Sequence, residues 1–216
     1  QAIRKADGTS NPDAIQIISP YRGEFYGTGA LNVLMQNDFN PYWIHRYNLD
    51  GISYFDKVIQ FRNRPKSDMA YAYNQETRAV EQHEVYNGEI GLVLMHPFDQ
   101  KNKRYNYIST IERFQVAFSN KNRQRLRYNY GREYGRNDKG WNLPEQKVQE
   151  NLELAYAISV HKSQGSEFDY VYIVIPKRDS HLLSMELLYT AITRAQKKVT
   201  ILLQEDIGTL TALGHI

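Results

Sequence analysis

Five polar side chains lie close together in a short stretch between two apolar runs of the chain, and their types suit contacts with phosphate. They are Ser159, His161, Lys162, Ser163 and Gln164. They follow one predicted strand and open a short helix, so we expect them at the edge where α/β sheets bind ligands. Hydroxyl, imidazole and ammonium donors near a helix N-terminus suit phosphate oxygens. The alternative is that the serines only cap and turn the chain while His161 and Lys162 are solvated.

A single arginine, Arg194, follows a predicted amphipathic helix and precedes a predicted buried strand. A guanidinium in this position lies near the ligand edge of the sheet or near the opposite edge, and the spacing does not decide between them. The alternative is a solvated helix C-terminus, where Arg194, Lys197 and Lys198 would offset the helix dipole.

The elements that must position these residues alternate between strands and helices. Apolar runs predict strands at residues 15–19, 58–61, 152–159, 169–176 and 199–203, and apolar spacing predicts helices at 30–37 and 185–196. Ser184 is the expected cap of the last helix. Unbroken apolar strands that alternate with helices predict an α/β fold, with a parallel sheet covered by helices on both faces. Residues 63–82 are charged and weakly patterned, which predicts a loop.

The middle of the chain has a different pattern. Asn87 and Gly88 form a turn signal, and short strands are expected at 104–108, 113–118 and 124–130. Short alternating strands indicate a small antiparallel sheet or barrel. The predicted organisation is a tail or linker at 1–12, an α/β domain formed by 13–83 and 151–216, and an inserted β-rich subdomain at 84–150.

Positive charge is concentrated in this middle region. Between Gln100 and Trp141, eleven Lys and Arg residues stand against three Asp and Glu, which gives +8, whereas the rest of the chain carries −5. Such asymmetry is typical of a segment that faces a polyanion.

Other features exclude several classes of protein. The chain has no cysteine, which excludes a disulfide scaffold, a thiolate zinc site and a cysteine nucleophile. No apolar run approaches the roughly 18–20 residues needed to cross a bilayer, and the start shows no secretory signal, so we expect a cytoplasmic protein. The first residue is Gln1 rather than methionine, so we expect a piece of a longer protein. No Gly-Lys pair occurs, so the chain holds no P-loop.

The two polar segments together resemble motifs V and VI of superfamily 1 helicases, in the form found in the C-terminal domain of the UvrD/RecD-like group. YAISVHKSQGSEF is similar to motif V and LLYTAITRAQKKV to motif VI. IQIISPYRGEFYGTGALNVLMQ resembles motif IV, DKVIQFRN the strand after it, and VYNGEIGLV the start of an SH3-like insertion. The resemblance runs from about Ile15 to Leu203 and implies a RecA-like domain with an inserted SH3-like β-barrel.

The resemblance also implies roles for single residues. Arg194 corresponds to the arginine finger that reaches the γ-phosphate of ATP, and Arg22 to a second basic contact. Such a guanidinium faces the charge that develops on the transferring phosphoryl group. The turn of Gln164, Gly165, Ser166 and Glu167 would approach the nucleotide, with Glu167 near a ribose hydroxyl. Ser159, His161 and Lys162 would meet the backbone of single-stranded DNA.

The insertion would form part of the path of the DNA strand. Its candidates for phosphate contact and base stacking are Arg125, Arg127, Tyr128 and Tyr130. The alternative is a solvated loop with ordinary sheet tyrosines.

Taken as a whole, the resemblance implies the C-terminal motor domain of an ATP-dependent DNA helicase. ATP and Mg²⁺ would be its cofactors, with the P-loop and the metal ligands in an N-terminal RecA-like domain outside this chain. The fragment alone would hold neither cofactor and be inactive. The expected partners are single-stranded DNA, that N-terminal domain and possible repair or nuclease subunits, with no membrane. The resemblance also implies that the helicase would move along single-stranded DNA in the 5′→3′ direction. Two alternatives remain: a non-catalytic nucleic-acid-binding module of RecA-like fold, and an RNA-directed relative.

Overall fold

The computed structural model describes residues 11–46, 48–64, 71–95, 113–119, 126–131, 148–176 and 184–204 of the 216-residue chain. The chain forms two compact units, which are described separately. Unit 1 comprises Gln1–Met35 and Tyr156–Ile216, and unit 2 comprises Gln36–Ala155.

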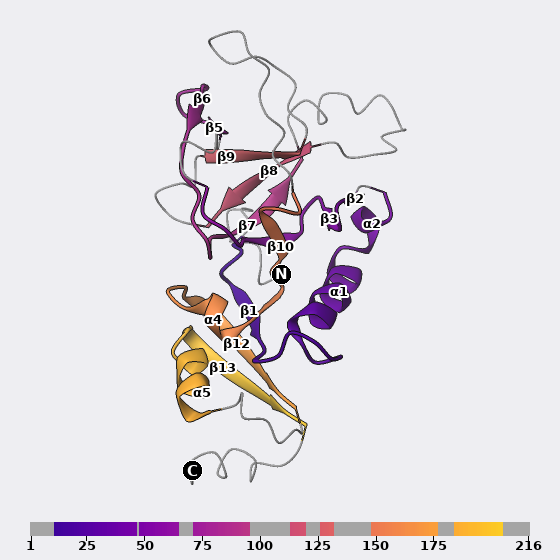
Figure 1. The fold of residues 1–216 in the computed structure, drawn as a ribbon, viewed down its shortest axis with the longest axis vertical. Helices are drawn as coiled ribbons and strands as arrows, with labels where there is room; N and C mark the ends of the chain where they lie inside the picture. Colours follow the sequence, from indigo (N-terminus) through magenta and orange to yellow (C-terminus); the bar gives the residue numbers. More distant parts are fainter. Residues whose placement is uncertain are drawn as a thin grey trace. The chain divides into compact units, whose positions relative to one another are not determined.

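Unit 1 is built on a four-stranded parallel sheet (Figure 1). Its strands are β1 (Ile15–Ile18), β11 (Ala157–Ile158), β12 (Phe168–Ile175) and β13 (Ala195–Leu203). The order is β11-β1-β12-β13, and each neighbouring pair runs parallel. The buried side chains of β1 and β12 are mostly apolar and include Ile18, Phe168 and Ile173, whereas Gln16 of β1 is a buried polar residue. The predicted α/β class with a parallel sheet is confirmed.

Among the described residues, three helices belong wholly or partly to unit 1: α1 (Thr28–Phe39), α4 (Val160–Ser163) and α5 (Met185–Ile192). Ser184 caps α5 as predicted, because its hydroxyl accepts a hydrogen bond from the Leu187 amide at 3.2 Å. The buried residues Leu188 and Ala191 lie on one side of α5, which packs on β12, β13 and α4 (Figure 1).

The last helix is shorter and the last strand longer than the sequence predicted. α5 ends at Ile192 instead of residue 196, and β13 begins at Ala195 instead of residue 199. Ala195 already pairs with Phe168 of β12, so the sheet takes the residues that helical spacing alone assigned to the helix.

Helix α1 completes the β11 edge of the parallel sheet. The Asn32 side-chain amide donates to the Ala157 carbonyl at 2.9 Å, and the Ala157 amide donates to Asn32 Oδ1 at 2.8 Å. One side chain thus supplies the donor and the acceptor that a further strand would offer.

Unit 2 contains a seven-stranded antiparallel sheet of order β10-β4-β7-β8-β9-β5-β6. Its strands are β4 (Lys57–Gln60), β5 (Tyr71–Asn74), β6 (Val80–Gln82), β7 (Ile90–Leu94), β8 (Arg113–Phe118), β9 (Leu126–Gly131) and β10 (Leu152–Leu154). The helix α2 (Pro41–Ile44) and the hairpin β2 (Asn48–Leu49) and β3 (Ile52–Ser53) precede the sheet. Its core is rich in aromatic rings, with Tyr54, Phe114, Tyr128 and Tyr130 all fully buried.

The structure divides the chain differently from the predicted boundaries at 84 and 150. Strand β4, expected in the α/β domain, pairs with β7 and β10 in the antiparallel sheet. The predicted strand 152–159 is split between the two sheets. The Ala155 amide bonds to Lys57 in unit 2, whereas the Tyr156 carbonyl accepts from Ile17 in unit 1.

The predicted loop at 63–82 was wrong, because it contains β5 and β6, and β5 pairs with β9. The predicted strands at 113–118 and 124–130 are found as β8 and β9. The strand expected at 104–108 and residues 1–10 of the expected tail lie outside the described residues. An SH3-like barrel remains a prediction, since the pairing between described strands runs from β10 to β6 without joining those two edges.

Within the described ranges, no helix has both the length and the apolar character required to cross a membrane.

Candidate functional site

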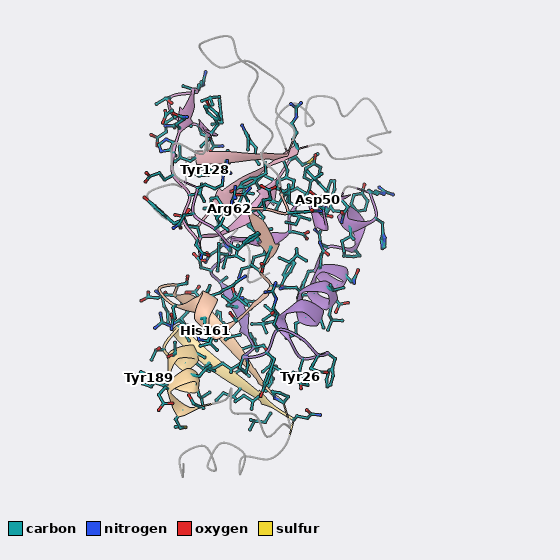
Figure 2. All side chains as sticks on the ribbon, viewed as in Figure 1. Tyr26, Asp50, Arg62, Tyr128, His161 and Tyr189 are labelled. Atoms are coloured by element: carbon teal, nitrogen blue, oxygen red, sulfur yellow. The ribbon has the colours of Figure 1, made fainter. Side chains whose placement is uncertain are left out.

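The short helix α4 holds the first group of predicted site residues. The Ser159 hydroxyl caps it by accepting from the Lys162 amide at 3.3 Å. Ser163 is buried and its hydroxyl donates to the Val160 carbonyl at 2.7 Å. For Ser163 the alternative, in which the serine only caps and turns the chain, is therefore the better description. His161 is exposed and Lys162 is half-buried, which leaves both within reach of a ligand. Figure 2 shows His161 on α4.

A tight turn leads from α4 into β12. The Ser166 amide donates to the Ser163 carbonyl at 3.1 Å, and Gly165 has a φ of +80°, in the left-handed region that favours glycine. Glu167 is exposed, and its Oε2 accepts from the Gln196 side chain at 2.6 Å.

Arg194 lies beside this turn. Its Nε donates to the Thr190 carbonyl at 3.1 Å, its Nη2 to the Thr193 hydroxyl at 3.1 Å, and its Nη1 to the Ser166 carbonyl at 3.4 Å. The Phe168 amide also donates to the Arg194 carbonyl at 2.8 Å. Residues from the two segments that resemble motifs V and VI therefore form one cluster, in which the half-exposed guanidinium is oriented by its neighbours.

The parallel sheet places the predicted residues at two different edges. Arg194 and Glu167 precede β13 and β12, and these strands pair from Phe168 and Ala195 onward, so the pair lies at the amino ends. Ser159 follows the carboxyl end of β11, beside Ser19 at the end of β1. The sequence did not decide at which edge of the sheet Arg194 lies. In the structure it lies at the edge opposite the N-terminus of α4.

Arg22 lies in the loop that follows the carboxyl end of β1. It is exposed, and its carbonyl accepts from the Gly29 amide at 3.1 Å. The structure does not bring the two predicted catalytic arginines together, because the sheet separates the loop after β1 from the residues that precede β13.

The residues predicted for the insertion have different surroundings. Tyr128 has no exposed surface, packs edge-on against Phe118 at 5.3 Å between ring centroids, and donates its hydroxyl to the Glu84 carbonyl at 3.3 Å. Tyr130 is equally buried and donates to Gln60 Oε1 at 2.7 Å. Neither ring has a face to offer to a base, so the prediction that they stack on DNA is corrected to ordinary core tyrosines.

The two arginines predicted in the insertion are Arg125 and Arg127. Arg127 is half-buried on β9, where burial lowers the pKa of its guanidinium, and it donates to the Leu126 carbonyl at 3.0 Å. Arg125 lies outside the described residues. Contact of either residue with phosphate remains a prediction.

No group of three or more His, Asp and Glu side chains within the described residues could hold a metal ion.

Two residues near the site were missed by the sequence reasoning. Gln196 binds Glu167 across neighbouring strands, and Asn32 fixes the strand that leads to Ser159. Strand β13 has no regular alternation of buried and exposed residues, so its pattern does not indicate Gln196. Nothing in the local pattern of α1 singles out Asn32.

Comparison with known proteins bears on the same segment. Residues 154–202, which include α4, the turn, α5 and Arg194, match the UvrD-like helicase C-terminal domain. The RecBCD enzyme subunit RecD of Mycobacterium tuberculosis is 51% identical over 51 residues, which cover 24% of this chain and 9% of that protein. The chain contains a superfamily 1 helicase C-terminal domain. This helicase domain is RecD-like, as the resemblance of the two motifs implied.

Two longer relatives match most of the chain. An uncharacterised protein of Methanocaldococcus jannaschii, MJ1519, is 31% identical over 205 residues, which are 90% of this chain and 15% of that protein. The ATP-dependent RecD2 DNA helicase of Deinococcus radiodurans is 26% identical over 189 residues, 87% of this chain and 20% of that protein. The chain thus spans a fifth or less of the length of these relatives.

Solved structures of Pif1 helicases are also similar. Pif1 from Bacteroides in complex with ADP-AlF3 and single-stranded DNA aligns over 95% of this chain and 43% of its own, with 19% identity and a TM-score of 0.42.

Proposed function

We propose that this helicase domain is the second motor domain of an ATP-dependent, RecD-like DNA helicase. In this proposal it provides an arginine finger and part of the track for single-stranded DNA, and it is inactive without a first motor domain that carries the P-loop. The observation that carries the proposal is the cluster of Arg194 with the Ser166–Glu167 turn at the amino ends of β12 and β13.

The geometry of Arg194 suits an arginine finger. Bonds to Thr190, Thr193 and Ser166 engage three of its five N–H donors among the described residues, and the side chain is half-exposed. A guanidinium that is held in place before the reaction loses little entropy when it meets a phosphate. Its remaining donors would stabilise the charge that develops on the γ-phosphoryl group.

The neighbouring turn would contact the rest of the nucleotide. Glu167 is exposed beside Arg194 and can accept a hydrogen bond from a ribose hydroxyl, while Gln196 fixes the orientation of its carboxylate. ATP with Mg²⁺ would supply the transferable phosphoryl group, and the Mg²⁺ ligands would belong to the first motor domain. Arg22, the other predicted basic contact, lies at the opposite end of the parallel strands from Arg194, so this arrangement does not support contact of both arginines with one nucleotide.

The DNA track would follow α4. Ser159, His161 and Lys162 lie where the N-terminus of α4 meets the carboxyl end of β11. Hydroxyl and ammonium donors of this kind bind phosphate oxygens without reading sequence. Binding through them would depend strongly on salt, because each neutralised phosphate of a single strand releases condensed counterions.

The partners follow from the same proposal. The N-terminal motor domain of the same protein would complete the ATP site. The name of the RecD relatives as RecBCD subunits suggests further repair or nuclease subunits as partners.

The isolated 216-residue chain tests this function in two ways. It should hydrolyse no ATP above background with or without oligodeoxythymidylate, since it holds no P-loop. It should nevertheless bind the oligonucleotide, and Lys162→Ala should flatten the slope of log affinity against log salt by about 0.7. Lys198→Ala, an exposed lysine on β13, is the matched control and should leave the slope unchanged.

Two results would contradict the proposal. One is DNA-stimulated ATP turnover by the isolated chain at the rate of a motor protein. The other is the absence of oligonucleotide binding at low salt.

A further inference from the structure

Unit 2 exposes a group of aromatic rings that no motif of the sequence identified. Trp43 of α2 lies at its centre, with ring centroids 4.9 Å from Tyr42 and 5.2 Å from Phe55, both edge-on. The guanidinium of Arg46 lies 4.2 Å from the centroid of the Tyr42 ring. We call Tyr42, Trp43, Arg46 and Phe55 the aromatic platform.

The platform is exposed but rigidly supported. Tyr42 and Phe55 are 54% and 47% exposed, although aromatic rings of this size are usually covered. Trp43 also packs edge-on against Tyr54, which is fully buried in the core of the unit. The rings therefore face solvent from a fixed base.

Phe55 has an unfavourable backbone conformation. Its φ is +69°, in the left-handed region that a bulky residue rarely adopts. Strain of this kind persists only where the surrounding structure imposes it, and it is concentrated at functional sites.

A buried carboxylate holds the turn that contains Phe55. Asp56 is fully buried and accepts from the Ser53 amide at 2.7 Å, from Asn40 at 2.7 Å and from Gln36 at 2.5 Å. The Phe55 amide itself donates to the Val93 carbonyl at 2.8 Å. These bonds hold the turn in which the Phe55 ring is directed into solvent.

Unit 2 as a whole is weakly basic, and Arg46 is the cationic group of the platform itself. Unit 2 carries eighteen Lys and Arg against fifteen Asp and Glu, so it holds the whole net charge of +3, and unit 1 is neutral. On the platform, Arg46 and its neighbour His45 are exposed. The acidic group of the nearby hairpin turn is Asp50, which Figure 2 labels.

We infer that the aromatic platform is a stacking site for the bases of single-stranded nucleic acid. Exposed rings with an adjacent guanidinium are the combination that binds single strands without sequence preference. In this arrangement a base stacks on Phe55 or Tyr42, while Arg46 contacts the neighbouring phosphate. This inference rests on the proposed function but uses residues outside the motif V and motif VI segments.

The test compares two probes on the full chain: labelled oligodeoxythymidylate and an abasic oligonucleotide of equal length, which keeps the phosphates and lacks the bases. The wild type should prefer the first probe. Phe55→Gly and Tyr42→Ala should each weaken binding to oligodeoxythymidylate about tenfold. Neither variant should change binding to the abasic strand. Tyr86→Ala, another aromatic of unit 2 that is also 47% exposed, is the matched control and should change neither affinity.

A measurement of thermal unfolding separates a binding role from a structural one. Phe55→Gly should change the unfolding temperature little, because glycine adopts the left-handed conformation without strain and this gain offsets the lost ring contact with Trp43. If the platform is only a packing cluster, Phe55→Gly will unfold earlier and both Phe55→Gly and Tyr42→Ala will bind oligodeoxythymidylate like the wild type, which overturns the inference.

The remaining outcomes separate this inference from the proposed function. If Lys162→Ala weakens binding while Phe55→Gly and Tyr42→Ala do not, the DNA track along α4 stands and the platform is overturned. If the wild type binds both probes equally, base stacking is overturned. If it binds neither, both ideas are overturned.

Discussion

At the scale of single residues, the orientation of Arg194 is the feature on which the ATP side of the proposed function depends. Its guanidinium is held by the carbonyls of Thr190 and Ser166 and by the Thr193 hydroxyl. The sequence predicted this residue through its resemblance to motif VI, but it could not place it at an edge of the sheet. That placement depends on the pairing of Phe168 with Ala195, a long-range contact.

The error at Tyr128 has a physical reason as well. Tyr128 shares one face of β9 with Leu126 and Tyr130, and five of the six residues of the strand are buried. The stacking role was predicted from the residue type and not from this pattern. The strand lies between β8 and β5, and side chains cover both of its faces. A single strand pattern does not reveal what covers its second face.

The close packing of Gly27 in the loop that carries Arg22 gives a prediction about stability. A Cβ at this position would lie 1.8 Å from the Gly23 carbonyl oxygen, which is backbone and cannot move aside easily. Gly27→Ala should lower the free energy of unfolding by about 1–3 kcal/mol, as overpacking does. Chemical denaturation measures this. Gly23→Ala is the control, because a Cβ there meets nothing within 4 Å, and equal stabilities of the two variants would refute the argument.

At the scale of elements, the strands of the parallel sheet were predicted well because each is a short apolar run bounded by polar residues. The prediction was wrong where one apolar run contributes strands to both sheets. This happens at Ala155 and Tyr156, whose backbone hydrogen bonds are made with different units. Local periodicity reports that a residue is extended and carries no information on its partner strand. The hairpin of β5 and β6 was missed for a related reason, since its exposed residues weaken the alternation.

The cap of α5 gives a prediction at this scale. A hydrogen bond from Ser184 is the main cause that lowers the pKa of the Glu186 carboxyl below its ordinary value. Ser184→Ala should therefore raise the pKa of Glu186 towards that value, and it should also cost about 1 kcal/mol of stability through the lost cap.

The sign of the pH dependence follows from the lowered pKa. The contribution of Glu186 to the free energy of unfolding is present above the ordinary pKa of a glutamate. It is lost as the pH falls through the lowered pKa of the folded state. Titration of the carboxyl by NMR in wild type and variant measures the shift. An unchanged midpoint in Ser184→Ala would show that the hydroxyl does not hold the carboxylate.

At the scale of the whole molecule, the chain crosses between its two units twice, near residue 36 and near residue 155. The sequence pattern placed the β-rich part at 84–150, because the turn signal at Asn87 and Gly88 and the short predicted strands begin there. The structure extends this part to Gln36–Ala155, since Val58 of β4 belongs to its core and Trp43 packs against that core. In the proposals above, unit 1 would contact ATP through Arg194 and DNA through α4, and unit 2 would contact DNA bases through the aromatic platform.

The most direct test of the central claim is the rate of the chemical step in the full-length parent at saturating ATP and single-stranded DNA, with wild type and Arg194→Ala compared in single-turnover experiments. The account predicts a loss of roughly 10³ or more in rate with nucleotide affinity nearly unchanged, because the finger acts on transition-state charge. Lys198→Ala should react like the wild type, and thermal unfolding should confirm that Arg194→Ala remains folded. A weakened nucleotide affinity with an unchanged rate at saturating ATP would contradict the account, and Arg194 would then be a structural or ground-state arginine.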